Sequence, residues 1–307
     1  MSSRDAGEVR VGGKQLKLSN LSKVLYPKTG FTKAQVIDYY LRVSKVLLPH
    51  LRDRPLTLKR YPNGVDHPHF FEKNCPSHRP PWVRTAGVWS EQNGRVMQFC
   101  LVNDVPTLIW VANLAALELH VPLARARSYD RPDQVVFDLD PGAPADIVHC
   151  CRVGLMVRDL FHSLGLEAFA KTSGSKGLQV YVPLNTAGVT YQETKPFARA
   201  VAELLEREHP DLVVSNMKKA LRTGKVLVDW SQNDPHKTTV CVYSLRAKER
   251  PTVSAPVSWD EVAACARERD SQLLIFDSEE ALRRVERDNE LFAPLLARKQ
   301  KLPRLGR

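Results

Sequence analysis

The sequence has no long, uninterrupted apolar run. Its most apolar stretch, residues 105–124, contains Asn113, Glu118 and His120, so it is too short and too polar to span a bilayer. We therefore expect a buried helix at about residues 107–119, closed by His120. The first twenty residues carry charges where a signal peptide needs apolar side chains. Together these absences favour a cytoplasmic protein without a membrane partner.

Cysteine is scarce and lacks a pattern. The six cysteines form no C-x-x-C pair and have no histidine spacing of the kind that binds zinc. Because structural disulfides are rare in the cytoplasm, we expect all of them to be reduced thiols. These residues are Cys75, Cys100, Cys150, Cys151, Cys241 and Cys265.

Acidic residues are fewer than basic ones, 34 against 45, which gives a formal net charge of +11. Such a surplus favours a polyanionic partner, either nucleic acid or an anionic membrane surface. The proportions of hydrophobic (43%) and charged (26%) residues are those of a globular protein, so disordered and fibrous classes are excluded. The surplus is also visible near the C-terminus, at Arg298, Lys299, Lys301, Arg304 and Arg307.

Strand-like and helix-like segments follow one another without a regular β–α alternation. We therefore expect an α/β or α+β architecture around a mixed or antiparallel central sheet flanked by helices. The other predicted helices are residues 33–51, 145–164 and 191–207. The predicted strands are residues 56–61, 95–102, 135–140, 178–183, 225–230 and 238–243.

The sharpest feature is a pair of carboxylates on one predicted strand. Asp138 and Asp140 alternate with Val135, Phe137 and Leu139, so the two acids share one face. A third acid, Asp229, ends another apolar strand. The three together could form the oxygen-rich cage that Mg²⁺ or Mn²⁺ prefers, with room for two ions. The alternative is that these acids accept hydrogen bonds at strand ends.

Residues 171–177, KTSGSKG, predict a turn suited to a phosphate. Small residues let backbone N–H groups converge, Ser173 offers a hydroxyl and Lys176 a charge. The spacing is not that of a Walker loop, and an ordinary turn with an exposed lysine is the alternative. Arg246, after the last predicted strand, could make bidentate contacts with a triphosphate.

Two further groups have the chemistry of nucleic-acid binding. An acid-free basic run could contact the DNA backbone, although such runs are often only solvated surface. It consists of Lys218, Lys219, Arg222 and Lys225. Phe70 and Phe71 lie in a loop-like segment, where exposed aromatic rings can stack on bases. His120, taken alone, is more typical of a core or capping residue than of a ligand.

Taken together, these residues resemble the polymerase domain of bacterial DNA ligase D, within the archaeo-eukaryotic primase-polymerase superfamily. The matching segments are LSNLSKVLYPKTGFTK (18–33), RPLTLKRYPNGVD (54–66), FFEKN (70–74), LELHVP (117–122), VVFDLDPG (135–142), KTSGSKGLQVYVPL (171–184), KVLVDWSQN (225–233) and VYSLRA (242–247).

The resemblance implies a single primase-polymerase catalytic domain, residues 1–307, with lobes at about 1–130 and 131–295 and a basic tail at 296–307. It implies that Asp138, Asp140 and Asp229 bind two metal ions, Mn²⁺ or Mg²⁺. Lys23 and Lys33 match residues that grip the 5′-phosphate of a gap. The positions that match nucleotide-binding residues of the family are Lys59, Phe70, Phe71, His120, Ser173, Lys176, Gln179, Gln232 and Arg246.

The chain departs from the family at two points. Gln179 stands where the family usually has histidine, which removes a side chain able to carry charge. The length leaves no room for the ligase and phosphoesterase modules, so we expect a stand-alone relative or an excised domain. The first would suit excision repair, and the second end joining with Ku and a DNA ligase.

The sequence thus predicts a bacterial, template-dependent nucleotidyltransferase that fills short gaps or extends ends of 5′-phosphorylated DNA. Its substrates would be rNTPs or dNTPs, with ribonucleotides preferred. Two other hypotheses remain open: a catalytically weak module that binds DNA ends or gaps and recruits repair partners, and a metal-dependent nuclease that uses the same acids.

Overall fold

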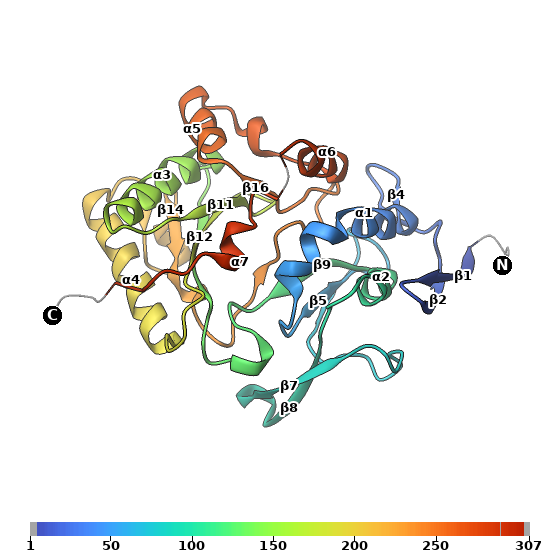
Figure 1. The fold of residues 1–307 in the computed structure, drawn as a ribbon. Coiled ribbons are helices and arrows are strands. Elements are labelled where there is room, and N and C mark those ends of the chain that lie inside the picture. Colours follow the sequence, from blue (N-terminus) through green and yellow to red (C-terminus); the bar gives the residue numbers. More distant parts are fainter. Residues whose placement is uncertain (1–4, 289, 304–307) are drawn as a thin grey trace. The chain divides into compact units, whose positions relative to one another are not determined.

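The computed structural model describes residues 5–288 and 290–303, which form two compact units (Figure 1). The first unit contains residues 5–122 and takes up the chain again at 240–253 and 277–288. The second unit contains the remaining described residues. Arg304 and Arg307 of the predicted tail lie outside the described residues. Nowhere in the described chain is a helix both long and apolar enough to cross a membrane.

The first unit is built on a four-stranded sheet in the order β15–β9–β5–β6, with two hairpins and a two-stranded pair. Helix α1 packs against α2 and α6. The strands are β1 (Ala6–Val11), β2 (Lys14–Ser19), β3 (Val24–Tyr26), β4 (Phe31–Thr32), β5 (Thr57–Arg60), β6 (Phe70–Glu72), β7 (Thr85–Ser90), β8 (Arg95–Cys100), β9 (Ala116–Val121) and β15 (Thr239–Val240). The helices are α1 (Lys33–Leu51), α2 (Val105–Asn113) and α6 (Ser278–Asp288).

Helix α1 has the bounds that the sequence predicts. It begins with a capping box, in which the Thr32 hydroxyl accepts from the Gln35 N–H and the Gln35 side chain accepts from the Thr32 N–H. Its buried tyrosines are satisfied: the Tyr39 hydroxyl donates to the carbonyl of Tyr243, and the Tyr40 hydroxyl to that of Leu117, both at 2.7 Å.

The expected helix over 107–119 is wrong in its second half. Helix α2 ends at Asn113, Ala115 adopts a positive φ of 57°, and Ala116–Val121 forms strand β9. Leu117 and Leu119 are fully buried and alternate with Glu118 and His120, which is the period of a strand rather than of a helix. The two polar side chains therefore share one face of the sheet.

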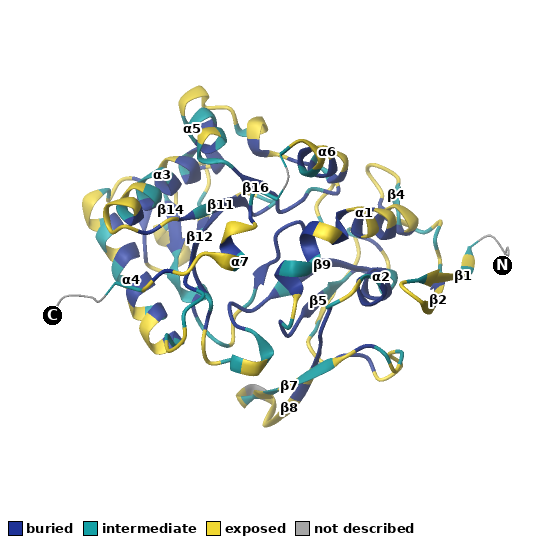
Figure 2. Cartoon of the chain, viewed as in Figure 1, coloured by how far each residue is buried: buried dark blue, intermediate teal, exposed yellow. Residues whose placement is uncertain are grey.

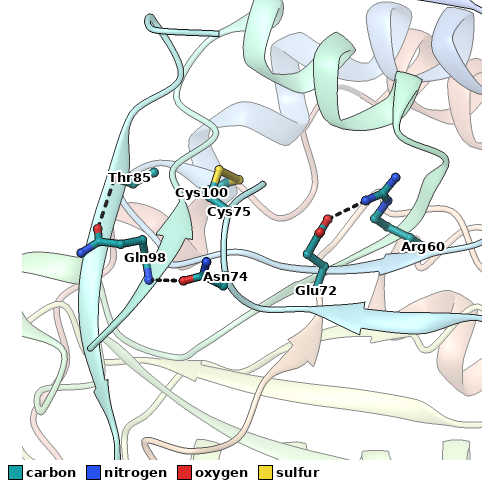
Figure 3. The surroundings of a disulfide bond; sticks show 7 residues. All are labelled: Arg60, Glu72, Asn74, Cys75, Thr85, Gln98 and Cys100. Atoms are coloured by element: carbon teal, nitrogen blue, oxygen red, sulfur yellow. Dashed lines mark hydrogen bonds and ion pairs between the residues drawn. A yellow bond between two sulfur atoms is a disulfide. The ribbon is translucent and has the colours of Figure 1, made fainter. Parts of the chain in front are cut away.

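The expectation that all six cysteines are reduced is wrong for two of them. Cys75 and Cys100 form a disulfide, which ties the segment after β6 to the end of β8 (Figure 3). Backbone pairing brings them together, because the Cys75 N–H donates to the carbonyl of Gln98 and the Gln98 N–H donates to the side chain of Asn74. The other four are free, buried thiols, as predicted.

The second unit is a six-stranded mixed sheet in the order β13–β14–β10–β12–β11–β16, in which only β13 and β14 run parallel among the described pairs. This confirms the expected fold class. The strands are β10 (Gln134–Pro141), β11 (Phe169–Thr172), β12 (Leu178–Pro183), β13 (Val213–Val214), β14 (Val226–Asp229) and β16 (Pro256–Val257). The helices are α3 (Ile147–Ser163), α4 (Tyr191–Glu208), α5 (Trp259–Glu268) and α7 (Pro294–Ala297).

The two faces of this sheet differ in chemistry. Phe137 of β10 packs against Phe161 of α3, whose ring in turn lies near Phe197 of α4, so these helices cover the apolar face. The central strands are mostly buried, which Figure 2 shows as dark blue ribbon. Asp138 and Asp140 alternate with Phe137 and therefore project from the opposite face.

Candidate active site

The three predicted acids gather on the second sheet. In the antiparallel pairing of β10 and β14, Asp138 lies directly opposite Asp229, and Asp140 follows two residues further along β10. Directly paired residues project from the same face, with their Cβ atoms about 5 Å apart. We call Asp138, Asp140 and Asp229 the acidic face. The alternation in the sequence predicted that Asp138 and Asp140 share a face, and the register adds Asp229.

The acidic face is short of positive charge. Burial, followed by the neighbouring carboxylates of Asp140 and Asp229, raises the pKa of Asp138 to about 7, although a hydrogen bond from Gln179 and the charge of Lys171 act in the opposite sense. The ionised form of Asp138 is therefore less favoured than that of an ordinary aspartate, and a bound cation would favour it.

Asp229 is already engaged by its own loop. One carboxylate oxygen accepts from the N–H and hydroxyl of Ser231 at 2.9 and 2.6 Å, and the other accepts from the Gln232 amide at 2.9 Å. Within the described residues, no three carboxylate, imidazole or thiol groups are yet arranged to hold a metal ion. The donor set nevertheless fits Mg²⁺ or Mn²⁺, because three hard carboxylates share one face and repel one another without a cation.

The glycine-rich turn closes on itself beside the acidic face. The Ser173 hydroxyl accepts from the N–H groups of Ser175 and Gly177, and Gly174 has a positive φ of 65°. A Cβ at Gly177 would lie 2.2 Å from the carbonyl oxygen of Leu139, so only glycine permits this approach to β10. Ser173 thus shapes the turn that carries Lys176.

A second cluster surrounds a buried carboxylate of the first unit, Glu118. Its oxygens lie 3.6 Å from Lys59 Nζ, 2.9 Å from His120 Nε2 and 3.4 Å from Arg246 Nε, and one also accepts from the Ala247 N–H at 3.1 Å. Hydrogen bonding to His120 and the charges of Arg246 and Lys59 outweigh burial and hold the pKa of Glu118 well below its usual range. We call Glu118, Lys59, His120 and Arg246 the Glu118 cluster.

Aromatic rings border the Glu118 cluster. Across β6, β5 and β9, Phe71 pairs with Lys59 and Lys59 with Glu118. The Lys59 ammonium lies 5.5 Å from the Phe71 ring centroid, and the Phe71 ring meets His120 edge-on at 5.9 Å. Phe70 and Phe71 remain 44% and 55% exposed, which agrees with rings available for stacking.

A cavity of the first unit, about 240 Å³ in volume, is lined by Lys23 and Lys33, the two lysines predicted to grip a 5′-phosphate. Lys33 is buried and donates to the carbonyl of Ser19 at 2.7 Å, whereas Lys23 donates to Asn63 at 2.9 Å. Burial, followed by the charge of Lys23, lowers the pKa of Lys33 to about 8. Arg60 also lines this lysine pocket, although its guanidinium pairs with Glu72 at 2.9 Å (Figure 3).

The predicted basic run divides into two kinds of residue. Lys218 and Lys219 are exposed. Arg222 donates to the carbonyl of Met217 at 2.5 Å, and Lys225 donates to that of Pro210 at 2.6 Å, so both also stabilise their own loop. DNA binding by these four residues stays a prediction.

Some predicted residues are brought together and others are not. Lys59, His120 and Arg246 meet at Glu118, whereas Gln179 and Gln232 each contact one acid of the acidic face. Sequence reasoning missed Glu118 and Lys171. The alternation L-E-L-H-V could have revealed the first, and no local signal points to the second.

Known proteins are similar to this chain. The family model described as "LigD, primase-polymerase domain" matches residues 32–292. The multifunctional non-homologous end joining protein LigD of Mycolicibacterium smegmatis is 43% identical over 283 residues, which cover 92% of this chain and 36% of that protein. The bifunctional LigD of Bacillus subtilis is 35% identical over 248 residues, covering 81% of this chain and 39% of that protein.

A solved structure agrees with these sequence matches. The polymerase domain from Mycobacterium tuberculosis ligase D in complex with DNA superposes with a TM-score of 0.84 at 41% identity. The match covers 93% of this chain and 99% of that one. The chain therefore spans little more than a third of the length of the mycobacterial relatives but nearly all of this solved domain.

Proposed function

The chain belongs to the LigD primase-polymerase domain family, a family of nucleotidyltransferases, and from that premise we propose that it is a template-dependent polymerase that fills short gaps or extends ends during DNA repair. The acidic face is the observation that carries this proposal, because three carboxylates at adjacent register positions suit a divalent-cation site. The names of the relatives favour end joining over excision repair.

In the proposed reaction the primer 3′-hydroxyl attacks the α-phosphate of a nucleoside triphosphate in line, and pyrophosphate leaves. Two bound Mn²⁺ or Mg²⁺ ions would activate the attacking oxygen and offset charge on the leaving group. Asp138, Asp140 and Asp229 would hold them. No side chain needs to act as a covalent nucleophile, so the chain contributes positioning and charge.

The nucleotide is the proposed ligand of two groups of side chains. Lys59, His120 and Arg246 offer donors to the phosphates, and the Ser173 turn adds Lys176. Phe70 and Phe71 would stack on bases, and Gln179 and Gln232 would act beside the acids. Because these residues come from both units, we propose that one activity requires both. Ribonucleotides are the proposed preferred substrates.

Gapped or broken DNA with a 5′-phosphate is the proposed partner. The lysine pocket places two cationic side chains close enough that one lowers the pKa of the other, and a phosphate would relieve that repulsion. Lys218, Lys219, Arg222 and Lys225 would contact the DNA backbone. Ku and a DNA ligase are the proposed protein partners, in keeping with the end-joining relatives.

The deciding experiment incubates the protein with a 5′-phosphorylated gapped duplex, Mn²⁺ and labelled rNTP or dNTP. The wild type should extend the primer. Asp138→Asn and Asp140→Asn should lower extension more than about 10³-fold while sparing DNA binding, because loss of charge removes metal ligands. The exposed Asp130→Asn variant of the same unit is the matched control and should extend normally.

The three hypotheses separate in this assay. Normal extension by Asp138→Asn contradicts the proposed mechanism. Release of nucleotides from the DNA without added triphosphate would indicate the nuclease instead. DNA binding without extension or release would indicate the catalytically weak binding module.

A further inference from the structure

Lys171 is a buried lysine that the proposed reaction does not use. It lies on β11 and is 1% exposed. Its ammonium donates to Gln179 Oε1 at 2.5 Å and to Ser254 Oγ at 2.7 Å. Burying an ammonium costs several kcal/mol unless it is well paired, so an apolar side chain would fill this space more favourably. We therefore expect the ammonium of Lys171 to have a role that an apolar side chain could not fill.

Lys171 stands at the end of a row that leads to the acidic face. Across β11, β12, β10 and β14, Lys171 pairs with Gln179, Gln179 with Asp138, and Asp138 with Asp229. Paired residues project from the same face, so the four side chains form one transverse line. Gln179 is the link between the ammonium and the catalytic carboxylates.

The two ends of the Gln179 amide have different neighbours. An ammonium can only donate, so the carbonyl oxygen must face Lys171, and the Tyr181 hydroxyl donates to the same oxygen at 3.3 Å. The amide nitrogen is then the end that donates to Asp138, to which the Gln179 side chain is hydrogen-bonded. A carboxylate can only accept when ionised, so this orientation satisfies both partners.

We propose that Lys171 is a positioning residue that fixes the orientation of the Gln179 amide, so that Gln179 donates to Asp138 and aims its carboxylate oxygens at the divalent cation. This inference rests on the proposed function. Without Lys171 the oxygen and nitrogen of the amide can exchange places at no cost in shape, and an amide oxygen facing Asp138 repels it.

The same polarity explains why glutamine can stand where the family usually has histidine. An imidazole between an ammonium and a carboxylate has one favourable neutral form, with its bare nitrogen toward Lys171 and its N–H toward Asp138. Glutamine offers the same acceptor and donor on the same two sides. Methionine fills a similar volume but offers neither, so it is the informative substitution.

The test measures Mn²⁺ binding to the free protein, without DNA or nucleotide, from the electron paramagnetic resonance of unbound Mn²⁺. Lys171→Met and Gln179→Met should each weaken binding about 10- to 100-fold, the usual effect of losing a partner that orients a ligand. Gln179→His should bind within about threefold of the wild type. The double variant should bind no more weakly than Gln179→Met alone, because Lys171 acts through Gln179.

Two further variants separate the alternatives. Ser254→Ala removes a hydroxyl that accepts from Lys171 but leaves the amide contact, so it should stay within about threefold of the wild type. Thermal melts check that each variant is folded. If Lys171→Met does not fold, Gln179→Met and Gln179→His still decide the outcome.

Wild-type binding by folded Gln179→Met, or a Lys171→Met defect that persists undiminished in the Gln179→Met background, overturns the inference while leaving the proposed function intact. Asp138→Asn is the reference for the site itself. If that variant binds Mn²⁺ as the wild type does, the proposed metal site is wrong, and the inference falls with it.

Discussion

Glu118 and Asp138 are two shielded acids in opposite electrostatic surroundings. Each lies on a sheet strand in a transverse row of paired side chains, Phe71–Lys59–Glu118 in the first unit and Lys171–Gln179–Asp138–Asp229 in the second. Cationic side chains surround Glu118 and depress its pKa, whereas burial and two further carboxylates raise the pKa of Asp138 to about 7.

This difference in electrostatic surroundings indicates a structural role for Glu118 and a ligand-binding role for Asp138. The charge of Glu118 is neutralised within the protein, so we expect it to hold Lys59, His120 and Arg246 in place. The positive charge near Asp138 does not balance its carboxylate. A carboxylate in such surroundings favours the binding of a cation. Lys33 is the opposite case. The charge of Lys23 disfavours the protonated form of Lys33, and a bound anion would offset that repulsion.

The largest expected effect comes from neutralising Glu118. Glu118→Gln leaves the charges of Lys59 and Arg246 without a buried counterion, so the free energy of unfolding at pH 7 should fall by about 3 kcal/mol. Urea titration measures it. A carboxyl whose folded pKa is depressed stabilises the protein above its unfolded pKa and loses that effect as pH falls. The deficit of the variant should therefore begin to shrink below about pH 4.5.

A matched control for this prediction is Glu279→Gln. Glu279 is 60% exposed and its pairing with Arg42 at 3.6 Å is a surface contact, so its loss should change stability by less than about 0.5 kcal/mol. Equal stability of Glu118→Gln and Glu279→Gln would break the comparison, because Glu118 would then not be a structural counterion.

The same chemical change at Asp138 should act in the opposite direction. With divalent ions removed by EDTA, Asp138→Asn should raise the free energy of unfolding at pH 8 by about 2 kcal/mol. A carboxyl with a raised folded pKa stabilises the protein below its unfolded pKa, and this contribution is lost as pH rises to about 7. The asparagine variant does not titrate and escapes that loss.

Urea titrations at pH 4 and pH 8 test the sign. The wild type should lose stability relative to Asp138→Asn between these pH values, and Mn²⁺ should restore it in the wild type more than in the variant. If Asp138→Asn destabilises the protein at pH 8 without metal, the carboxylate of Asp138 stabilises the fold as that of Glu118 does. The proposed difference between the two acids would then be wrong.

Much of the acidic face could be predicted because its signal is local. Strict alternation around Asp138 and Asp140 gives their common face from the period of a strand alone. The mixed sheet and the bounds of α1 likewise follow from periodicity and from the Thr32 cap. Which strand lies beside β10 is not a local property, so Asp229 could be grouped with the other two acids only from its similar place at the end of an apolar strand and from the resemblance to a family.

The Glu118 cluster could not be predicted because the spacing of apolar residues changes from that of a helix to that of a strand within one apolar stretch. The apolar stretch of residues 105–124 predicts a helix over 107–119, but Ala115 adopts a positive φ and the chain continues as strand β9. Lys171 and the Cys75–Cys100 disulfide were hidden for another reason. Both depend on which segments pair across a sheet or hairpin, and one sequence does not encode such long-range contacts in any simple spacing.

The smallest expected effect concerns the lysine pocket. At pH 7 the protein should bind a gap with a 5′-phosphate about tenfold more tightly than a gap with a 5′-hydroxyl, measured by competition in fluorescence anisotropy. Below its folded pKa of about 8 Lys33 is protonated and attracts the phosphate, and above it the charge is lost. The preference should therefore decline as pH rises from 7 to 9.

Lys33→Met should remove the preference and its pH dependence, whereas Lys45→Met, at an exposed position of the same helix, should keep both. The ratio of the two gaps cancels general effects of pH on DNA binding, since only the terminal phosphate differs between them. Equal binding of the two gaps at pH 7 would mean that the repulsion between Lys23 and Lys33 is not relieved by a phosphate. The lysine pocket would then not be a phosphate site.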